Sequence, residues 1–401
     1  MKIDQATLGR LMDVVKSATD TDEVEARYTG PLVYEKFDTL VRYFRSHGKD
    51  FSEQDTIDVS VQLDGKTYRV TAAGPPDVAA VMAAVANRSA IDPAHRADLV
   101  CIMKSMAEAV TIAKYDMKVT RKHEVPVTQR ATLTQIAERF GSNTRIVRTK
   151  RRFSCLSEDG MCRFDLTAVN HMAMISTSEH TTDIRYEAEV ELLPTGEKRR
   201  DARPAALALL KGFSIILKLV NGTDYVLSAD ERQAVLNRYS SLTKAGGKFI
   251  GPKPVTLELR HLAEPTPGSD SVRGNYTITD KADGERALAF VDAAGDLYLI
   301  DDRMGVSATG LHSAALTDTL FDCEVVRLKD EQRRLIACFD VYFHKGRDVR
   351  GLPLALGIGR DAEDRISYMT RALAAAAFVK QKPGDPDIIA KEFRVVQYGG
   401  D

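Results

Sequence analysis

Three glutamates alternate along one segment of the chain, at Glu187, Glu189 and Glu191. Side chains two residues apart on a β-strand point to the same face, so these carboxylates share one side of a strand. Glu23 and Glu25 repeat the pattern near the N-terminus. Carboxylates held this close repel one another unless something positive lies between them. The alternation therefore predicts two acidic strand faces around a divalent cation, and it disfavours a sandwich whose inward faces are apolar.

Basic residues alternate on the strand-like segments between the two acidic ones. Lys150 and Arg152 share one face of RTKRRFS, and Arg69 alternates on TYRVT. Lys122 and Arg163 are looser candidates. Oxygen-only ligands suit Mg²⁺ or Mn²⁺ rather than zinc, and carboxylates combined with fixed Arg and Lys side chains suit a polyphosphate. The alternative is a solvated strand face of alternating charge, which the order of acidic and basic strands disfavours.

These motifs resemble the triphosphate tunnel metalloenzyme family over roughly residues 20–195. EVEAR and YEAEVEL resemble its first and last acidic strands, and RTKRRFS and RFDLTAV resemble the basic strands between them. The resemblance implies an eight-stranded antiparallel tunnel that binds a triphosphate. It implies a metal held by Glu23, Glu25, Glu187, Glu189 and Glu191. It also implies that the cations Arg69, Lys150, Arg152 and Arg163 are the catalytic residues that bind the phosphates. RNA 5′-triphosphatases, thiamine triphosphatases and some adenylyl cyclases share this fold, which does not choose among them.

A second constellation, KADGER, contains Lys281, Asp283, Gly284 and Arg286 between two strand-like segments. A lysine amine must lose its proton before it can attack phosphorus, and a neighbouring cation favours that loss. Arg286 could supply this charge and hold a phosphate or a ribose, and Gly284 would let the backbone approach a nucleotide closely. The alternative is an ordinary surface turn.

KADGER resembles the KxDGxR signature of the covalent nucleotidyltransferases, which include mRNA guanylyltransferases and polynucleotide ligases. The resemblance implies that Lys281 forms a covalent bond to GMP. It also implies nucleotide contacts from residues of four downstream motifs. These are Arg303 in LYLIDDRM, Asp322 and Glu324 in TLFDCEVV, Phe339 and Asp340 in RLIACFDVYF, and Arg360 after VRGLPL. In TLFDCEVV, Cys323 takes the position of the family's glycine. The last motifs of that family and its OB fold are not recognisable, and Lys380 and Lys382 are typical of a solvated helix end. We therefore expect an N-terminal portion of a longer polypeptide.

The predicted fold class is α+β, with an antiparallel tunnel over 1–226 and an incomplete nucleotidyltransferase domain over 227–401. The apolar spacing predicts helices near 78–90, 98–110, 202–220, 229–242 and 362–380. Ser228 and Glu231 predict a capping box at one of them. Asp64 and Gly65 predict the turn of a hairpin. The sequence has no apolar run long enough to predict a transmembrane helix. Its cysteines have no CxxC spacing, which predicts free thiols.

A tunnel followed by a KxDGxR domain resembles the mRNA capping enzymes of large nucleocytoplasmic DNA viruses. That resemblance implies removal of the γ-phosphate of 5′-triphosphate RNA, transfer of GMP from GTP, no membrane partner, and a cap methyltransferase domain or subunit. It implies action in the host cytoplasm or the virion core. One alternative is a polynucleotide ligase that uses ATP, joined to a general triphosphatase domain. Another is a non-catalytic binding module. A net charge of −1 excludes a uniformly basic nucleic-acid binder.

Overall fold

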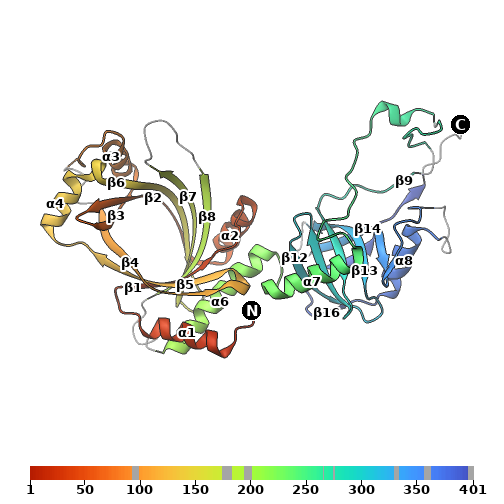
Figure 1. Cartoon of the computed structure of the whole chain (residues 1–401), viewed down its shortest axis with the longest axis horizontal. Helices are drawn as coiled ribbons and strands as arrows, with labels where there is room; N and C mark the ends of the chain where they lie inside the picture. The colour runs from red at the N-terminus through yellow and green to blue at the C-terminus, as the bar shows by residue number, and fades with distance from the viewer. Residues whose placement is uncertain are drawn as a thin grey trace. The chain divides into compact units, whose positions relative to one another are not determined.

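The computed structural model describes residues 1–92, 99–173, 183–193, 201–264, 266–273, 276–328, 334–355 and 363–395. The chain divides into two compact units, Met1–Gly222 and Thr223–Asp401. This division lies close to the boundary that the sequence predicts after residue 226. Figure 1 labels the elements of both units, and each unit is described by itself.

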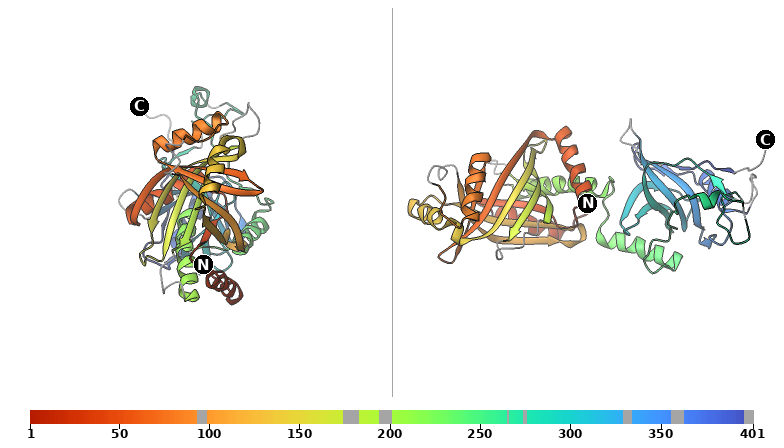
Figure 2. Two further views of the ribbon diagram at one scale, coloured as in Figure 1. Left: turned by 90° about the vertical axis from the view of Figure 1, so that its left-hand side faces the viewer. Right: turned by 90° about the horizontal axis from the view of Figure 1, so that it is seen from above.

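Eight antiparallel strands close the first unit into a barrel, in the order β1-β5-β4-β3-β2-β6-β7-β8, with β8 pairing back onto β1 (Figure 2). The predicted antiparallel tunnel is therefore confirmed. The strands are β1 (Asp22–Tyr28), β2 (Lys49–Leu63), β3 (Lys66–Ala73), β4 (Val100–Ile112), β5 (Met117–Pro126), β6 (Thr144–Leu156), β7 (Cys162–Ala173) and β8 (Asp183–Leu192).

The barrel has its apolar side chains outside and its charged side chains inside. On β1, Val24 and Ala26 are fully buried and alternate with Glu23 and Glu25. Because the outward positions are apolar, they must be covered, and helices cover them. Figure 1 shows α1 and α6 together along one side of the barrel and α3 with α4 along another. The helices are α1 (Gln5–Lys16), α2 (Tyr34–His47), α3 (Pro75–Ala86), α4 (Arg130–Glu138), α5 (Phe140–Asn143) and α6 (Ala202–Asn221).

Helix α6 is, among the described helices, the one long and apolar enough to cross a membrane by length and composition. The sequence analysis did not expect such a run. In the structure Leu209, Phe213 and Ile216 are fully buried, and α6 packs on β1, β7 and β8. A Cβ at Gly212 would lie 2.9 Å from a methyl group of Val190 on β8, so the helix approaches the barrel closely. These contacts are those of a core helix that covers the outside of the tunnel.

Two local expectations for this unit have clear outcomes. The predicted hairpin turn is confirmed, because Asp64 and Gly65 both have positive φ, of 49° and 76°, as a tight two-residue turn requires. The predicted helix near 98–110 is wrong, because residues 100–112 form β4, which pairs with both β3 and β5. Closing the barrel needs a strand at this place, and the pairing overrides the helix propensity of its Met, Ala and Glu residues.

The second unit is built on a mixed sheet in the order β15-β14-β13-β10-β11-β12-β16, with β17 parallel to β14 and a separate pair of β9 and β18. Its strands are β9 (Thr277–Ile278), β10 (Glu285–Val291), β11 (Asp296–Asp301), β12 (Val306–His312), β13 (Thr319–Arg327), β14 (Arg334–His344), β15 (Arg347–Asp348), β16 (Val379–Lys380), β17 (Asp387–Ala390) and β18 (Arg394–Val395). The helices α7 (Ala229–Thr243) and α8 (Arg365–Ala375) pack on it.

The capping box predicted for α7 is present, with Ser228 and Glu231 bonding each other's backbone N–H groups. The predicted helix near 362–380 is shorter, and it ends at Ala375. Lys380 is not at a helix end, because it lies in β16 and forms an ion pair of 2.6 Å with Asp387. The chain leaves the helix early because residues 379–380 extend the sheet beside β12.

Candidate active site

The acidic end of the tunnel is formed by two neighbouring strands. The register pairs Glu25 of β1 with Glu191 of β8, and Arg27 with Glu189. Glu25 and Glu189 are buried, and Glu23 lies one alternation before Glu25 on the same face. The five glutamates chosen from the sequence therefore belong to adjacent strands of one closed barrel, as their spacing requires.

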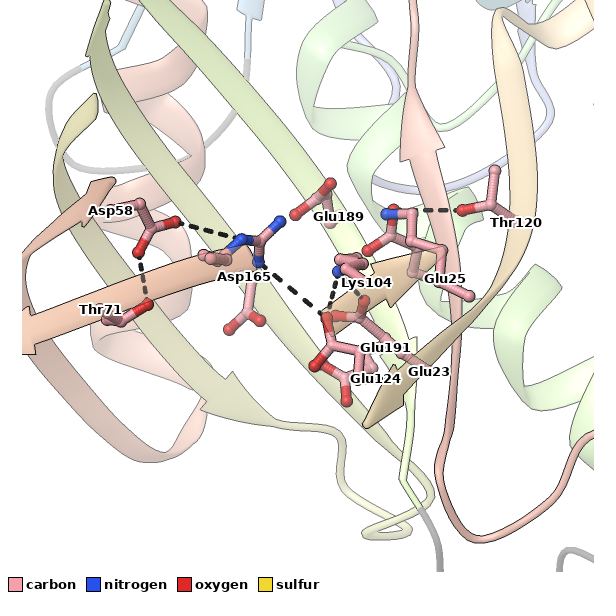
Figure 3. A network of polar contacts seen from close by, with 12 residues as sticks. Glu23, Glu25, Asp58, Thr71, Lys104, Thr120, Glu124, Asp165, Glu189 and Glu191 are labelled. Carbon is pink, nitrogen blue, oxygen red and sulfur yellow. Dashed lines mark hydrogen bonds and ion pairs between the residues drawn. The ribbon is translucent and has the colours of Figure 1, made fainter. Parts of the chain in front are cut away.

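Basic side chains hold these carboxylates. Lys104 of β4 lies between Glu23 and Glu124 and donates to both, as Figure 3 shows. Other basic side chains form ion pairs at the same end: Lys122 with Glu25, Arg163 with Glu191, and Arg27 with both Glu189 and Glu187. Within the part of the chain that the structure describes, no three carboxylate, His or Cys side chains converge as a preformed metal centre.

The charges at this end are not balanced evenly. Burial opposes ionisation of Glu23, but the ammonium of Lys104 outweighs it and holds the pKa of Glu23 at about 2. Burial raises the pKa of Glu189 to about 7, and the carboxylate of Glu25 adds to the rise. Burial also raises the pKa of Glu191 to about 7, against the attraction of Arg163. Two of the carboxylates thus lack full compensation, and a cation near them would relieve the repulsion.

The basic side chains of the middle strands converge on two buried aspartates. Lys150 donates to Asp58. The other oxygen of Asp58 accepts a hydrogen bond of 2.8 Å from Thr71, which Figure 3 shows. Arg69 approaches Asp58 at 3.8 Å. Burial lowers the pKa of Lys150, Asp58 raises it, and the nearby charge of Arg69 lowers it again. Lys150 and Arg69 are therefore brought together inside the tunnel by one carboxylate.

Asp165 of β7 organises the second group. Arg163 donates to it at 3.0 Å, and Arg152 approaches it at 3.8 Å. Arg151 faces the opposite way, because it pairs with Glu53 on the outside of the barrel. The predicted alternation of Arg151 against Arg152 therefore holds in the structure.

Sequence reasoning missed several charged residues of the tunnel: Arg27, Asp58, Lys104, Glu124 and Asp165. Arg27 continues the alternation of Glu23 and Glu25, and Asp165 alternates with Arg163, so the same periodicity could have identified both. Lys104 lay on a segment that was expected to be helical, which hid its face.

The KADGER motif of the second unit lies in an exposed loop that leads into β10. Lys281 and Asp283 are exposed, and the described contact of the Lys281 ammonium is a weak one of 3.4 Å to the carbonyl of Ala282. The N–H of Gly284 donates to Glu324 of β13 at 3.0 Å. A Cβ at Gly284 would lie 2.5 Å from the carbonyl oxygen of Val325, so glycine is needed for this approach.

Arg286 is held by its own unit. Its guanidinium makes a two-pronged contact with the fully buried Asp322, through Nε at 3.0 Å and Nη2 at 2.5 Å. Nη1 donates to the carbonyl of Pro252 at 2.6 Å. The ring centroids of Phe249 and Phe339 lie 5.6 and 5.8 Å from the guanidinium carbon. The structure therefore brings Gly284, Glu324, Arg286 and Phe339 together around the start of β10.

The remaining predicted residues of this unit differ in their exposure and in their contacts. Arg303 is exposed in the turn after β11, and Asp340 is bound by Arg365 at 2.8 Å. Cys323 lies within β13 and not in a turn, with its thiol fully buried. Arg360 lies outside the described residues.

A closed antiparallel barrel of eight strands with a charged interior has the architecture of the triphosphate tunnel proteins. The chain is similar to a probable mRNA-capping enzyme of Acanthamoeba polyphaga mimivirus, with 24% identity over 264 residues. The match covers 65% of this chain, and the chain spans 21% of the length of that relative. Because 264 residues exceed the length of either unit, the match includes parts of both. No family model matches the sequence.

Two solved structures are each similar to about half of the chain. One is the RNA triphosphatase domain of a trifunctional mimivirus mRNA capping enzyme, with 18% identity, a TM-score of 0.40, and coverage of 54% of this chain and 99% of that chain. The other is an RNA triphosphatase of S. pombe, with 13% identity, a TM-score of 0.36, and coverage of 54% and 93%.

Proposed function

We propose that this chain acts in mRNA 5′-cap formation. The first unit hydrolyses the γ-phosphate of 5′-triphosphate RNA, and the second carries the lysine for GMP transfer. The observation that carries the proposal is the interior of one closed barrel, where an acidic end adjoins the cluster of Lys150, Arg152 and Arg69. The similarity to a protein named as a probable mRNA-capping enzyme supports the choice of RNA as substrate.

The carboxylates fit a divalent metal with oxygen ligands, Mg²⁺ or Mn²⁺. The raised pKa values of Glu189 and Glu191 indicate uncompensated negative charge, which is the donor chemistry that such a cation requires. Glu23, Glu25, Glu189 and Glu191 would hold the ion. Glu187 is the weakest member because it lies nearest the start of β8, beyond the stretch that pairs with β1. When bound, the metal supplies positive charge that polarises the γ-phosphate and favours ionisation of the attacking water.

The protein side chains supply the rest of the phosphate chemistry. Lys150, Arg69 and Arg152 bind phosphate oxygens and stabilise the charge that develops as the γ-phosphoryl group leaves. Asp58 and Asp165 hold these cations in place before the substrate arrives, so little reorganisation is needed. The closed barrel surrounds the triphosphate with fixed charges instead of bulk water.

In the second unit, Lys281 attacks the α-phosphorus of GTP after losing a proton. A phosphorus–nitrogen bond forms, the bond to the β-phosphate oxygen breaks, and pyrophosphate leaves. Phe339 is suited to stack on the guanine, and Glu324, Asp283 and Arg303 to contact the nucleotide. The lysine-bound GMP is then transferred to the RNA: an oxygen of the terminal diphosphate bonds to the α-phosphorus, the phosphorus–nitrogen bond breaks, and Lys281 is regenerated. A methyltransferase domain or subunit would act next, in the host cytoplasm or the virion core.

Phosphate release from 5′-triphosphate RNA tests the proposal. The chain should release one phosphate per RNA end with Mn²⁺ or Mg²⁺ and none with EDTA, and Glu25→Ala should abolish release while its circular dichroism stays unchanged. Glu158→Ala, in the exposed turn between β6 and β7, is the control and should behave as the wild type. RNA binding without any phosphate release would favour the non-catalytic alternative.

A further inference from the structure

Positive side chains line one end of the tunnel. At this end β6 and β8 begin and β7 ends. The register places Arg148 of β6 directly opposite His171 of β7, and Arg185 lies on the same face of the neighbouring β8. Each lies an even number of residues from a tunnel-facing residue of its own strand, so all three side chains are on the tunnel face. Arg148 and His171 are half-buried and Arg185 is exposed, so the arginines reach from the interior to the opening.

The arginines dominate the charge at this opening. Burial lowers the pKa of His171, and the charges of Arg148 and Arg185 lower it further. The register also places two acidic residues here, Asp58 of β2 opposite Arg148 and Asp183 of β8 opposite His171. Lys150 donates to Asp58, and Glu187, further inside along β8, is engaged by Arg27 at 3.6 Å. Arg148 and Arg185 therefore outnumber Asp183 at the opening, which leaves it positive without any contribution from the imidazole.

The opposite end of the tunnel has the reverse character. β1 begins and β8 ends there, which places Glu23 and Glu191 near that opening, and Glu124 lies near the end of β5. Along β8, Arg185 lies about 13 Å from Glu189 at the rise of an extended strand. Because Lys104 and Arg163 neutralise only part of this charge, a polyanion longer than the triphosphate is attracted more strongly at the positive opening than at this one.

An exposed aromatic side chain lies beside the positive opening. α2 begins just after β1 ends, so its first residue, Tyr34, is at this end of the barrel. The Tyr34 ring is packed 6.0 Å from the ring of Tyr186 on β8, and Tyr186 in turn packs 4.7 Å from Phe37. Tyr34 nevertheless remains 59% exposed. A ring fixed on one side and open on the other is suited to stacking with a nucleobase.

We infer that Arg148, Arg185 and Tyr34 form the entry rim over which single-stranded RNA reaches the tunnel, with its first phosphates on the two arginines and a base stacked on Tyr34. The inference rests on the proposed function, because it assigns the direction from which that substrate enters. Backbone contacts and stacking are both tolerant of sequence, so the rim would accept any transcript with a flexible 5′ end.

The test compares two substrates that share three phosphates: a short single-stranded 5′-triphosphate RNA and inorganic tripolyphosphate. Tyr34→Ala should raise the KM for RNA about 5-fold or more, with kcat and tripolyphosphate hydrolysis unchanged, because stacking is lost and the tunnel is not. Tyr34→Phe keeps the ring and should keep the wild-type KM. Arg185→Gln should raise the KM for RNA and reduce the salt dependence by about 0.7 in log–log slope.

Matched controls lie on the same elements away from the rim. Tyr43→Ala is near the other end of α2, and Arg151→Ala is on the outer face of β6, so both should behave as the wild type on both substrates. Equal effects of Tyr34→Ala on the two substrates, or none on RNA, would overturn the rim. A raised KM for RNA alone in Lys49→Ala would also overturn the rim, because Lys49 lies at the opposite end of the tunnel, where β2 begins. A wild type that hydrolyses neither substrate refutes the proposed function instead.

Discussion

Replacing Glu191 by glutamine should stabilise the metal-free protein at alkaline pH and abolish its response to metal. The pKa of Glu191 is raised from 4.5 to about 7, chiefly by burial and also by the carboxylates of Glu23 and Asp165. A rise of this size corresponds to about 3 kcal/mol of destabilisation when the carboxylate is ionised. Glutamine removes that charge and can still accept from Arg163, which keeps its bond of 3.0 Å to Asp165.

The direction of the pH dependence follows from the raised pKa. Between about pH 4.5 and 7 the folded protein keeps a proton on Glu191 that the unfolded chain has lost, so the wild type loses stability as the pH rises through this window. Below this window both states are protonated and the penalty vanishes. The difference between Glu191→Gln and the wild type should therefore be near zero at pH 4.5 and approach about 3 kcal/mol at pH 8.5.

Urea unfolding in EDTA, followed by circular dichroism at the two pH values, measures this difference, with Glu158→Gln as an exposed control. Added Mn²⁺ should then raise the melting temperature of the wild type but not that of Glu191→Gln. A glutamine variant that is less stable than the wild type at pH 8.5, or equally stabilised at both pH values, would refute the reasoning.

Three further outcomes are expected. Lys150→Ala and Arg152→Ala should each lower the turnover of 5′-triphosphate RNA by about 100-fold while changing metal affinity much less. Arg151→Ala should leave turnover unchanged. A larger loss from Arg151→Ala than from Arg152→Ala would contradict the phosphate role of the tunnel face. Asp322→Ala should cost about 3 kcal/mol of unfolding free energy because it leaves Arg286 without its partner, whereas Asp318→Ala, which breaks an exposed pair with Arg238, should cost under about 1 kcal/mol. After incubation with α-labelled GTP and denaturing electrophoresis, Lys281→Ala should carry none of the covalent GMP label that the wild type acquires. Preferential labelling by ATP would favour a ligase.

The tunnel was predictable because its strands carry an unusual signal. Alternating charges such as Glu187, Glu189 and Glu191 fix the strand period and the facing direction at once, so the sequence located both acidic strands and the face of Lys150 and Arg152. The strand β4 gave no such signal, because Lys104 is its one tunnel-facing charge among Met, Ala and Ser residues. Its conformation is set by pairing with β3 and β5, which only the closed barrel provides.

The partners of individual side chains could not be read from the sequence for a different reason. Asp58 and Lys150 are far apart in the chain, and they meet because β2 pairs with β6 in a particular register. The same holds for Arg286, which the motif suggested as a ligand for phosphate or ribose. The structure instead shows its guanidinium held by Asp322 and by the carbonyl of Pro252. Such contacts depend on registers between strands that no local pattern specifies.

The ion pairs of the tunnel predict that metal and triphosphate bind cooperatively. A metal alone would take Glu23 and Glu25 from Lys104 and Lys122, which would leave the Lys122 ammonium without this partner and Lys104 with Glu124 alone. A triphosphate alone would draw those lysines away and leave the carboxylates uncompensated. Together the two ligands satisfy both sets of charges. Saturating tripolyphosphate should therefore tighten Mn²⁺ binding at least 10-fold, and Mn²⁺ should tighten tripolyphosphate binding by the same factor, because the coupling is reciprocal. Calorimetric titrations of a slowly hydrolysing variant such as Arg152→Ala measure both factors, and independent affinities would show that the ion pairs persist when the ligands bind.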